Sequence, residues 1–281
     1  MHNMKRIALS ALAAAALSVV VSGCKDEAKA PPAAPPPANT PPPATPPPST
    51  PPPAATNTPP PAAGATTTAG GSASITGSVL FSGAVPEMKK LASSADAKCP
   101  KTVIDESALV KGGKLENVWI HVTKGAPAGA AVATTPVEVT QEGCMYKPRV
   151  QFVQVGQKIT VKNHDDTLHN VHTYLGATTV FNKAMPGKSA PAIDYTPSDE
   201  GMIKWKCDVH PWMRGFIGVA KTNLQATTGD SGDFKIDNVP PGTYTIEAWH
   251  EKFGTKTAEV TVEAGKPAKI DFKYDGTEKG S

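Results

Sequence analysis

Short runs of alternating hydrophobic and polar residues dominate the chain from about residue 74 onward. Glycine, proline, asparagine and aspartate separate these runs, which is the pattern of short strands joined by turns. No segment keeps a 3.6-residue hydrophobic period, and DESALVKGG and EMKKLASSADAK allow at most a short helix each. The pattern therefore predicts an all-β fold of the sandwich or barrel type. The candidate strands are SITGSVLF, LENVWIHVT, VEVT, RVQFVQV, QKITVKN, MIKWKC, GFIGVAK, DFKID, TYTIEAWH, TAEVTVE and AKIDFKY.

The start of the chain has a different pattern. Lys5 and Arg6 precede a hydrophobic run over residues 7–21, and small residues follow, as in a secretory signal. This run is shorter than the about 20 apolar residues of a membrane span. The letters VSGC at its end resemble a bacterial lipobox, so we predict a lipoprotein signal peptide over residues 1–23 and a lipid on Cys24. An ordinary secretory signal with a chance cysteine is the alternative.

Residues 24–73 are rich in proline and poor in large hydrophobic side chains. Such a segment cannot bury enough apolar surface to fold, so we predict a disordered linker. Polyproline II rises about 3.1 Å per residue, which makes this linker a semi-rigid tether between the lipid and a folded part. We therefore expect the protein on the periplasmic side of a bacterial envelope, with the lipid as its membrane contact. Lys25, directly after the lipidated cysteine, favours the outer membrane.

Roughly 200 residues remain after the linker, enough for one large or two small domains. A polar, turn-rich stretch around residues 221–232 predicts a boundary. We therefore divide this part into an N-terminal β region (74–136), a domain over residues 137–221 and a second domain over residues 222–281. Whether the N-terminal β region folds by itself or adds strands to the next domain stays open. The formal net charge of +3 is small and predicts no nucleic-acid partner.

The last region resembles a known type of module. The letters GDF, VPPG and YTI, with a closing strand that contains Phe272, are similar to the carboxypeptidase regulatory-like, or transthyretin-like, modules. The resemblance implies a small β-sandwich without chemistry of its own. His250 lies in this region with no candidate partner near it in the sequence, and we interpret it as a surface or packing residue.

Candidate chemistry is concentrated in the stretch IKWKCDVHPWMRGF, residues 203–216. In a strand, Cys207 shares one face with the hydrophobic residues two and four positions before it, so its thiol points into the core. His210 and Met213 follow at intervals of three residues, and a turn can bring their side chains back over the thiol. Thiolate, thioether and imidazole are ligands that suit copper. A buried thiol beside two packing residues is the alternative.

A further histidine lies upstream in QKITVKNHDDTLHNVHTY, where His169 and Asn170 follow a predicted strand. Here the sequence resembles the cupredoxins, the type 1 blue copper proteins, and most closely the amicyanin-like ones. His169-Asn170 matches the first copper histidine of that family with its asparagine. Cys207, His210 and Met213 match the short ligand loop, and the two motifs have the family's usual separation of a little under forty residues.

The resemblance covers residues 137–221 and implies a Greek-key β-sandwich that binds one type 1 copper ion. The implied ligands are His169, Cys207, His210 and Met213. Zinc is the alternative metal for a site of histidine and cysteine ligands.

The resemblance also implies roles for the surroundings of the metal. Four protein ligands leave no open position for a substrate, so an electron carrier and not an enzyme is expected. Asn170 would brace the Cys207 loop, since hydrogen bonds around a metal site fix its ligands. The edge of His210 would lie near solvent as the electron exit, framed by Pro211 and Trp212.

With Cys24 assigned to the lipid and Cys207 to copper, Cys99 and Cys144 are left as an even pair. Exported proteins normally pair their thiols, so we predict a disulfide between these two residues. It would join the N-terminal β region to the first strand of the cupredoxin domain. In the chain-entropy model such a bridge stabilises the fold by around 4 kcal/mol.

The other histidines receive simpler interpretations. His172 is a rival ligand by position, but the resemblance leaves it as a packing residue. His164 with Asp165 and Asp166 is interpreted as a charged turn, and His121 as an outward-facing strand residue.

Three functions are compatible with these features. The first is an envelope-anchored type 1 copper protein that carries one electron at a time between redox partners, such as a periplasmic cytochrome or dehydrogenase, which it meets transiently. The second is a structural or adhesive envelope lipoprotein whose β modules bind a surface partner. The third is a protein that holds or delivers copper.

Overall fold

The computed structural model describes residues 71–93 and 95–280. The predicted signal peptide (1–23), the lipidated Cys24 and the linker up to residue 70 lie outside the described residues. Within the described ranges the chain forms strands, turns and loops with no helix, which confirms the all-β fold. The two segments that allowed a short helix form turns and short strands instead. In this part of the chain no helix has the length and hydropathy of a membrane span.

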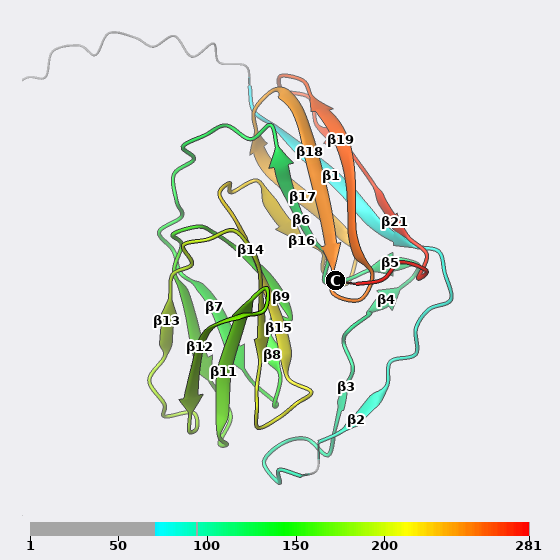
Figure 1. Cartoon of the computed structure of the whole chain (residues 1–281). Coiled ribbons are helices and arrows are strands. Elements are labelled where there is room, and N and C mark those ends of the chain that lie inside the picture. The colour runs from blue at the N-terminus through cyan, green and yellow to red at the C-terminus, as the bar shows by residue number, and fades with distance from the viewer. Residues whose placement is uncertain (1–70, 94, 281) are drawn as a thin grey trace, which may run out of the picture. The chain divides into compact units, whose positions relative to one another are not determined.

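Strands β7 to β15 form two sheets packed face to face, which we call the central sandwich (Figure 1). One sheet has the order β13-β10-β7-β8 and the other the order β12-β11-β14-β15-β9. Neighbours that are distant in sequence, such as the parallel pairs β7–β10 and β9–β15, give a Greek-key arrangement. The strands are β7 (Val137–Gln141), β8 (Tyr146–Lys147), β9 (Val150–Gln154), β10 (Ile159–Asn163), β11 (His169–Leu175), β12 (Thr178–Met185), β13 (Ile193–Tyr195), β14 (Gly201–Lys206) and β15 (Arg214–Ala220).

The alternation along β14 is the one that the sequence predicts. Ile203 and Trp205 are buried between the sheets, whereas Lys204 and Lys206 point outward. Strand β11 pairs with β14 in an antiparallel register that sets His172 opposite Lys206. This register brings the first residue of β11 beside the residue that follows β14, so two distant parts of the sequence meet at one end of the sheet.

A second pair of sheets, the outer sandwich, takes strands from both ends of the described chain. Strand β1 pairs with β17, β20 and β21, and β6 lies between β16 and β18. The strands are β1 (Ala73–Phe81), β4 (Val110–Lys111), β5 (Lys114–Leu115), β6 (Trp119–Lys124), β16 (Gln225–Thr227), β17 (Asp233–Val239), β18 (Gly242–His250), β19 (Gly254–Val262), β20 (Ala268–Lys269) and β21 (Phe272–Tyr274).

This pairing answers the question left open for residues 74–136. Their long strands β1 and β6 are neither a separate region nor part of the central sandwich. Ile75 and Val79 on β1 and Ile120 on β6 are fully buried in the same hydrophobic core as the C-terminal strands. The alternating pattern of β1 needs a partner surface for its inward face, and the C-terminal strands supply it.

The expectation that His121 on β6 faces outward is wrong. The residue is buried, and its ring stacks on Trp119 with 3.6 Å between the ring centroids. The adjacent strands β16 and β18 cover both edges of β6, and Trp249 from β18 packs with Trp119 in a small cluster that also contains Val150 of the central sandwich. Both sandwiches belong to the same compact unit of the chain.

Residues 82–105, which we call the strap, connect β1 to the following part of the outer sandwich. The strap contains β2 (Lys90–Ala92) and β3 (Thr102–Ile104), which pair with each other and join neither sandwich through strand pairing. In Figure 1 it is the cyan to blue-green segment between β1 and β4. A disulfide between Cys99 and Cys144 ties the strap to the central sandwich, as the sequence predicts.

Candidate metal centre

The predicted ligands lie at one end of the sheet that contains β11 and β14. His169 is the first residue of β11, and Cys207 directly follows β14. From there the chain makes a tight turn to β15. The amide N–H of Met213 donates to the carbonyl oxygen of His210 at 2.9 Å, and the amide of Cys207 donates to the carbonyl oxygen of Met213 at 3.3 Å. These bonds fold the cysteine and the second histidine toward the same point.

Three donor atoms converge there. The Nδ1 atoms of His169 and His210 are 2.9 Å apart, and the Sγ of Cys207 lies 4.0 Å from the first and 3.8 Å from the second. The circle through these three atoms has a radius of about 2.1 Å, a length that fits metal–imidazole bonds of about 2.0–2.1 Å and metal–thiolate bonds of about 2.3 Å. All three residues are buried: His169 is 0% exposed, Cys207 1% and His210 2%.

A carboxylate contacts the far nitrogen of each imidazole. The Nε2 of His169 is 2.9 Å from Oδ2 of Asp165, and the Nε2 of His210 is 3.1 Å from Oδ2 of Asp96. Each Nε2 must carry the hydrogen in order to donate to a carboxylate, which leaves a lone pair on Nδ1. Two lone pairs at 2.9 Å repel each other unless a cation lies between them.

A proton on His169 is a poor candidate for that cation, because burial lowers the pKa of this imidazole from its ordinary value. A proton between the two rings would also leave the sulfur atom without a partner. A metal ion, in contrast, accepts both lone pairs and the sulfur together. The residues therefore fit a metal bound by two nitrogen atoms and one sulfur atom, and a thiolate with two imidazoles is a set that copper accepts.

Met213 is fully buried and belongs to the same hydrophobic cluster as Cys207. Its place in the closed turn is consistent with a fourth, axial ligand. Its role as a ligand stays a prediction.

Asn170 contacts the loop that carries the cysteine. Its Oδ1 accepts a hydrogen bond of 2.6 Å from the amide of Asp208, the residue after Cys207, and its Nδ2 donates to Oδ2 of Asp208 at 2.9 Å. The same Nδ2 lies 2.7 Å from Oδ1 of Asn182 on β12. These bonds are the kind of bracing that the sequence suggested for this residue.

The expectation that the edge of His210 lies near solvent is wrong, because the residue is only 2% exposed. Its Nε2 edge lies under the strap, where Asp96 accepts its hydrogen bond and the Sγ of Cys99 is 3.6 Å away. Sequence spacing within the ligand loop contains no information about a segment more than a hundred residues upstream. Of the two residues expected to frame the exit, Pro211 is exposed, whereas Trp212 is half-buried and donates to the carbonyl oxygen of Cys144 at 3.0 Å.

Two residues next to the centre, Asp165 and Asp96, had no assigned role in the sequence pattern. Asp165 belongs to the stretch interpreted as a charged turn, yet it contacts His169 and accepts the amide hydrogens of Gly143 and Cys144 at 2.8 Å each. Its spacing of four residues from a candidate ligand was the available signal. Asp96 had a weaker signal, its position three residues before the predicted half-cystine Cys99.

The other histidines within residues 71–280 do not join the three donor atoms. His172 is half-buried, and its Nδ1 contacts Oδ2 of Asp208 at 2.8 Å. His164 is exposed. His250 is buried in the outer sandwich beside Phe253, which agrees with a packing role.

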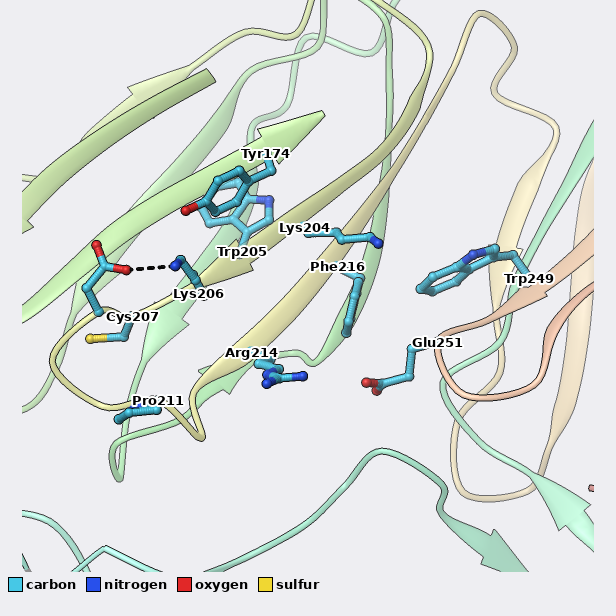
Figure 2. A pocket seen from close by; sticks show the side chains of 11 residues that line it. Tyr174, Lys204, Trp205, Lys206, Cys207, Pro211, Arg214, Phe216, Trp249 and Glu251 are labelled. Atoms are coloured by element: carbon cyan, nitrogen blue, oxygen red, sulfur yellow. Dashed lines mark ion pairs between the residues drawn. The ribbon is translucent and has the colours of Figure 1, made fainter. Parts of the chain in front are cut away.

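A cavity of about 550 Å³ lies behind the cysteine loop, between β14 and β15 and the end of β18 (Figure 2). Figure 2 shows the ion pair between Lys206 and Asp208, whose closest atoms are 3.1 Å apart. Because Cys207 is almost completely buried, the cavity does not open its sulfur atom to solvent. The lining residues are Tyr174, Lys204, Trp205, Lys206, Cys207, Asp208, Pro211, Arg214, Phe216, Trp249 and Glu251.

Comparison with protein families identifies one part of the chain. Residues 217–275 match the model of the carboxypeptidase regulatory-like domain. This match covers the C-terminal strands of the outer sandwich and confirms the resemblance noted there. No curated protein matches the chain.

Several solved copper proteins are similar to about a third of the chain. A purple cupredoxin from Nitrosopumilus maritimus is 22% identical, with a TM-score of 0.27, over 30% of this chain and 99% of that protein. The reduced Cu(I) form of an amicyanin mutant is 26% identical, with a TM-score of 0.28, over 36% of this chain and 97% of that one. A copper-containing nitrite reductase from Thermus scotoductus SA-01 is 22% identical, with a TM-score of 0.28, over 35% of this chain and 25% of that chain.

Proposed function

We propose that this protein is a type 1 copper protein that carries one electron at a time. The observation that supports the proposal is the convergence of two Nδ1 atoms and one Sγ atom, all buried, with both imidazoles turned by carboxylates so that their lone pairs meet. A copper ion held there would supply one-electron chemistry by changing between Cu(I) and Cu(II).

The protein's own part is to hold the ligands still. His169 is fixed by the pairing of β11 with β12 and β14, and Cys207 by the closed turn and by the bonds from Asn170 to the next residue. Ligands that barely move when the metal changes its charge keep the reorganisation small, which favours rapid electron transfer. Met213 is proposed as the weak axial ligand.

The burial of the three donor residues supports a carrier rather than an enzyme. A catalytic metal site keeps an open position for water or substrate. Here His169, Cys207 and His210 are each at most 2% exposed, so a substrate has no path to the donor atoms.

Partners would be small redox proteins, such as a periplasmic cytochrome or dehydrogenase, met in brief encounters. Leu168 and Val209 directly precede the two histidines, and they are 43% and 47% exposed. Pro211 is exposed beside them in sequence. An exposed apolar surface of this kind suits the small interfaces of transient redox complexes. We further propose that a lipid on Cys24 holds the protein on the periplasmic side of the envelope, at the outer membrane.

The decisive experiment adds Cu(II) to the purified protein and records its visible spectrum. We expect an intense thiolate-to-copper band in the protein and none in Cys207→Ser. Trp205→Phe is a suitable control, because it changes a buried neighbour on the same strand face and leaves all donor atoms in place. A protein that stays colourless with Cu(II) would contradict the proposal and would favour a structural or adhesive lipoprotein.

A second measurement separates a carrier from a protein that delivers copper. The blue protein is reduced and reoxidised several times in the presence of a Cu(I) chelator. We expect the band to return in full, since the ligands are buried and fixed. Copper that passes to the chelator on reduction would instead favour delivery.

A further inference from the structure

The strap covers the candidate metal centre at the edge of His210. Strands β2 and β3 pair with each other and with no strand of either sandwich, so the strap is held in place by other contacts. Two of them concern the metal centre: the disulfide from Cys99 to Cys144, and the side chain of Asp96. Backbone bonds form a tight turn that sets these two strap residues next to each other, with the amide of Cys99 donating to the carbonyl oxygen of Asp96 at 3.1 Å.

Asp96 is the hydrogen-bond acceptor of His210. Its Oδ2 is 3.1 Å from Nε2 of the histidine, and the hydroxyl of Thr167 donates to the same oxygen. Its Oδ1 accepts the amide hydrogen of Lys98 at 2.8 Å. The carboxylate is therefore fixed at both oxygen atoms, and it can hold the hydrogen of His210 on Nε2 and leave the Nδ1 lone pair facing Cys207.

The other end of the disulfide has a matching arrangement. Gly143 and Cys144 both have positive φ angles, of 63° and 57°, and their amide groups donate to the carboxylate of Asp165. A cysteine rarely adopts this left-handed conformation. The two hydrogen bonds to Asp165 help to stabilise it at Cys144. The same carboxylate contacts Nε2 of His169. Each half-cystine thus lies beside a carboxylate that holds one imidazole.

We propose that Asp96 is a positioning residue for His210, and that the Cys99–Cys144 disulfide keeps it in place, so that the strap is a working part of the metal centre. The benefit of this positioning for a metal rests on the proposed function. The positioning itself, which is the orientation of the His210 ring and the place of its hydrogen, can be tested without any metal. Asp96 contacts no donor atom of the centre; it acts through the ring of His210, whose orientation and hydrogen position it sets.

The first test uses the metal-free protein. The ¹⁵N shifts of the His210 ring, measured at a pH where the ring is neutral, report which nitrogen carries the hydrogen. We expect the Nε2-bound form in the unaltered protein and in Asp96→Asn, whose amide oxygen still accepts the bond. Asp96→Ala should move the hydrogen substantially to Nδ1, where it can reach the Nδ1 of His169. Asp166→Ala is the matched control, because it removes an exposed carboxylate of the same region that pairs with Lys188.

The second test concerns the disulfide. The double variant Cys99→Ser/Cys144→Ser frees the strap without altering Asp96. If the disulfide keeps the carboxylate in place, this variant should show the same shift of the His210 hydrogen as Asp96→Ala. In both variants the Nε2 of His210 should also become reactive toward diethylpyrocarbonate, from which the strap shields it in the unaltered protein.

The copper-loaded protein gives a further readout. Asp96→Ala should change the copper hyperfine splitting and the reduction potential, while Asp96→Asn should restore most of the original values. An unchanged His210 ring in Asp96→Ala would overturn the positioning role even if copper binds. An unchanged ring in the double serine variant would overturn the role of the disulfide. The hydrogen of the His210 ring can move as expected while the unaltered protein binds no copper. In that case the positioning role of Asp96 is supported and the proposed function is contradicted.

Discussion

At the scale of single residues, Asn170 contacts the cysteine loop through both ends of its side-chain amide. Its oxygen accepts from the amide of Asp208 at 2.6 Å, and its nitrogen donates to the carboxylate of the same residue at 2.9 Å. Asn170 is buried, so water cannot fully replace these bonds after a substitution. The residue therefore links the strand that begins with His169 to the loop that begins with Cys207.

Asn170→Ala should loosen that link. We expect copper affinity to fall by about 10- to 100-fold, the usual effect of removing a hydrogen bond that orients a metal ligand. The metal-free protein should also lose about 1–3 kcal/mol of unfolding free energy, because the amide of Asp208 loses its acceptor. Competition with a copper chelator measures the first effect and urea denaturation the second. Thr178→Ala, which alters an exposed residue at the start of β12, is the control, and equal copper affinities in the two variants would contradict the bracing role.

Three of the four candidate ligands could be predicted from local sequence. Cys207, His210 and Met213 lie within one turn, and the alternation of the preceding strand fixes which way the thiol points. His169 lies 38 residues upstream of Cys207, and only the family resemblance pointed to it. Asp96 could not be predicted in this way. It reaches His210 from a segment 114 residues upstream, and short patterns do not encode such a contact. The same reason explains the wrong expectation that the edge of His210 faces solvent.

At the scale of elements, β6 and β18 each carry a buried histidine in the outer sandwich. Burial lowers the pKa of His121 to about 4 and that of His250 to about 3, from an ordinary value of 6.5. In His250 the amide groups of Lys252 and Phe253 point at Nδ1, at 3.2 and 3.3 Å, so this atom must act as an acceptor. A proton on Nδ1 would remove both bonds, which agrees with the lowered pKa.

The outer sandwich should therefore lose stability in mild acid. Between pH 6.5 and about 4 the unfolded chain binds protons at both histidines, whereas the folded chain does not. Each histidine then lowers the free energy of unfolding by about 1.4 kcal/mol per pH unit as the pH falls through this window. Urea denaturation of the metal-free protein at several pH values measures the slope.

His250→Gln gives this pH prediction a direct check. Its side-chain oxygen can still accept from the nearby backbone, but it does not titrate, so the slope should decrease by about 1.4 kcal/mol per pH unit. If His250→Gln shows the original slope, this histidine does not cause the acid sensitivity.

At the scale of the whole described unit, a buried ion pair joins the two sandwiches. Arg149 precedes β9 of the central sandwich, and both Nε and Nη2 of its guanidinium donate to the carboxylate of Glu251, directly after β18. The two side chains are only 6% and 8% exposed. A bidentate pair of this kind fixes the relative position of the segments that it connects. Arg149 directly precedes Val150, and Glu251 follows Trp249 by two residues; Val150 and Trp249 both belong to the small hydrophobic cluster between the sandwiches. Polar and hydrophobic contacts therefore act at the same junction.

Loss of one partner should cost much more than loss of both. Arg149→Met leaves Glu251 buried without a counter-charge, and we expect a decrease of about 3–5 kcal/mol in unfolding free energy. The double variant Arg149→Met/Glu251→Leu should recover most of that loss. Chemical denaturation of the single and double variants forms a mutant cycle. Simple additivity of the two single effects would show that the ions do not interact as the structure indicates.

The exposed side chains beside the histidines allow a test of the proposed encounter surface. Val209→Lys places a charge on this surface, so two molecules should approach each other less readily. We expect the electron self-exchange rate to fall at least tenfold, with the visible band unchanged, as measured by NMR line broadening of mixed Cu(I) and Cu(II) samples. Val85→Lys, at an apolar position of the strap that is 60% exposed against 47% for Val209, provides the comparison. A similar decrease in both variants would place the encounter elsewhere.

How much of the architecture the sequence predicted also depends on scale. The all-β class followed from the alternation of hydrophobic and polar residues and from the turn residues. The sequence of each strand shows by itself which of its side chains are buried. The partnership of β1 with β17 and β21 did not follow, since an alternating strand such as β1 fits more than one sheet. The disulfide was predictable, because only Cys99 and Cys144 remained to pair once Cys24 and Cys207 had been assigned other roles.

The closed strap has a consequence for the order of events during maturation. An ion cannot easily reach the pocket of His169, Cys207 and His210 once the bridge from residue 99 has formed, because the last imidazole edge is then covered. Oxidation of the cysteines and uptake of the ion should therefore compete in time. A chain that meets copper while its thiols are still reduced should fill quickly, and a chain that oxidises first should fill slowly. The compartment that makes the bridge would thus also set how fast the protein takes up its metal.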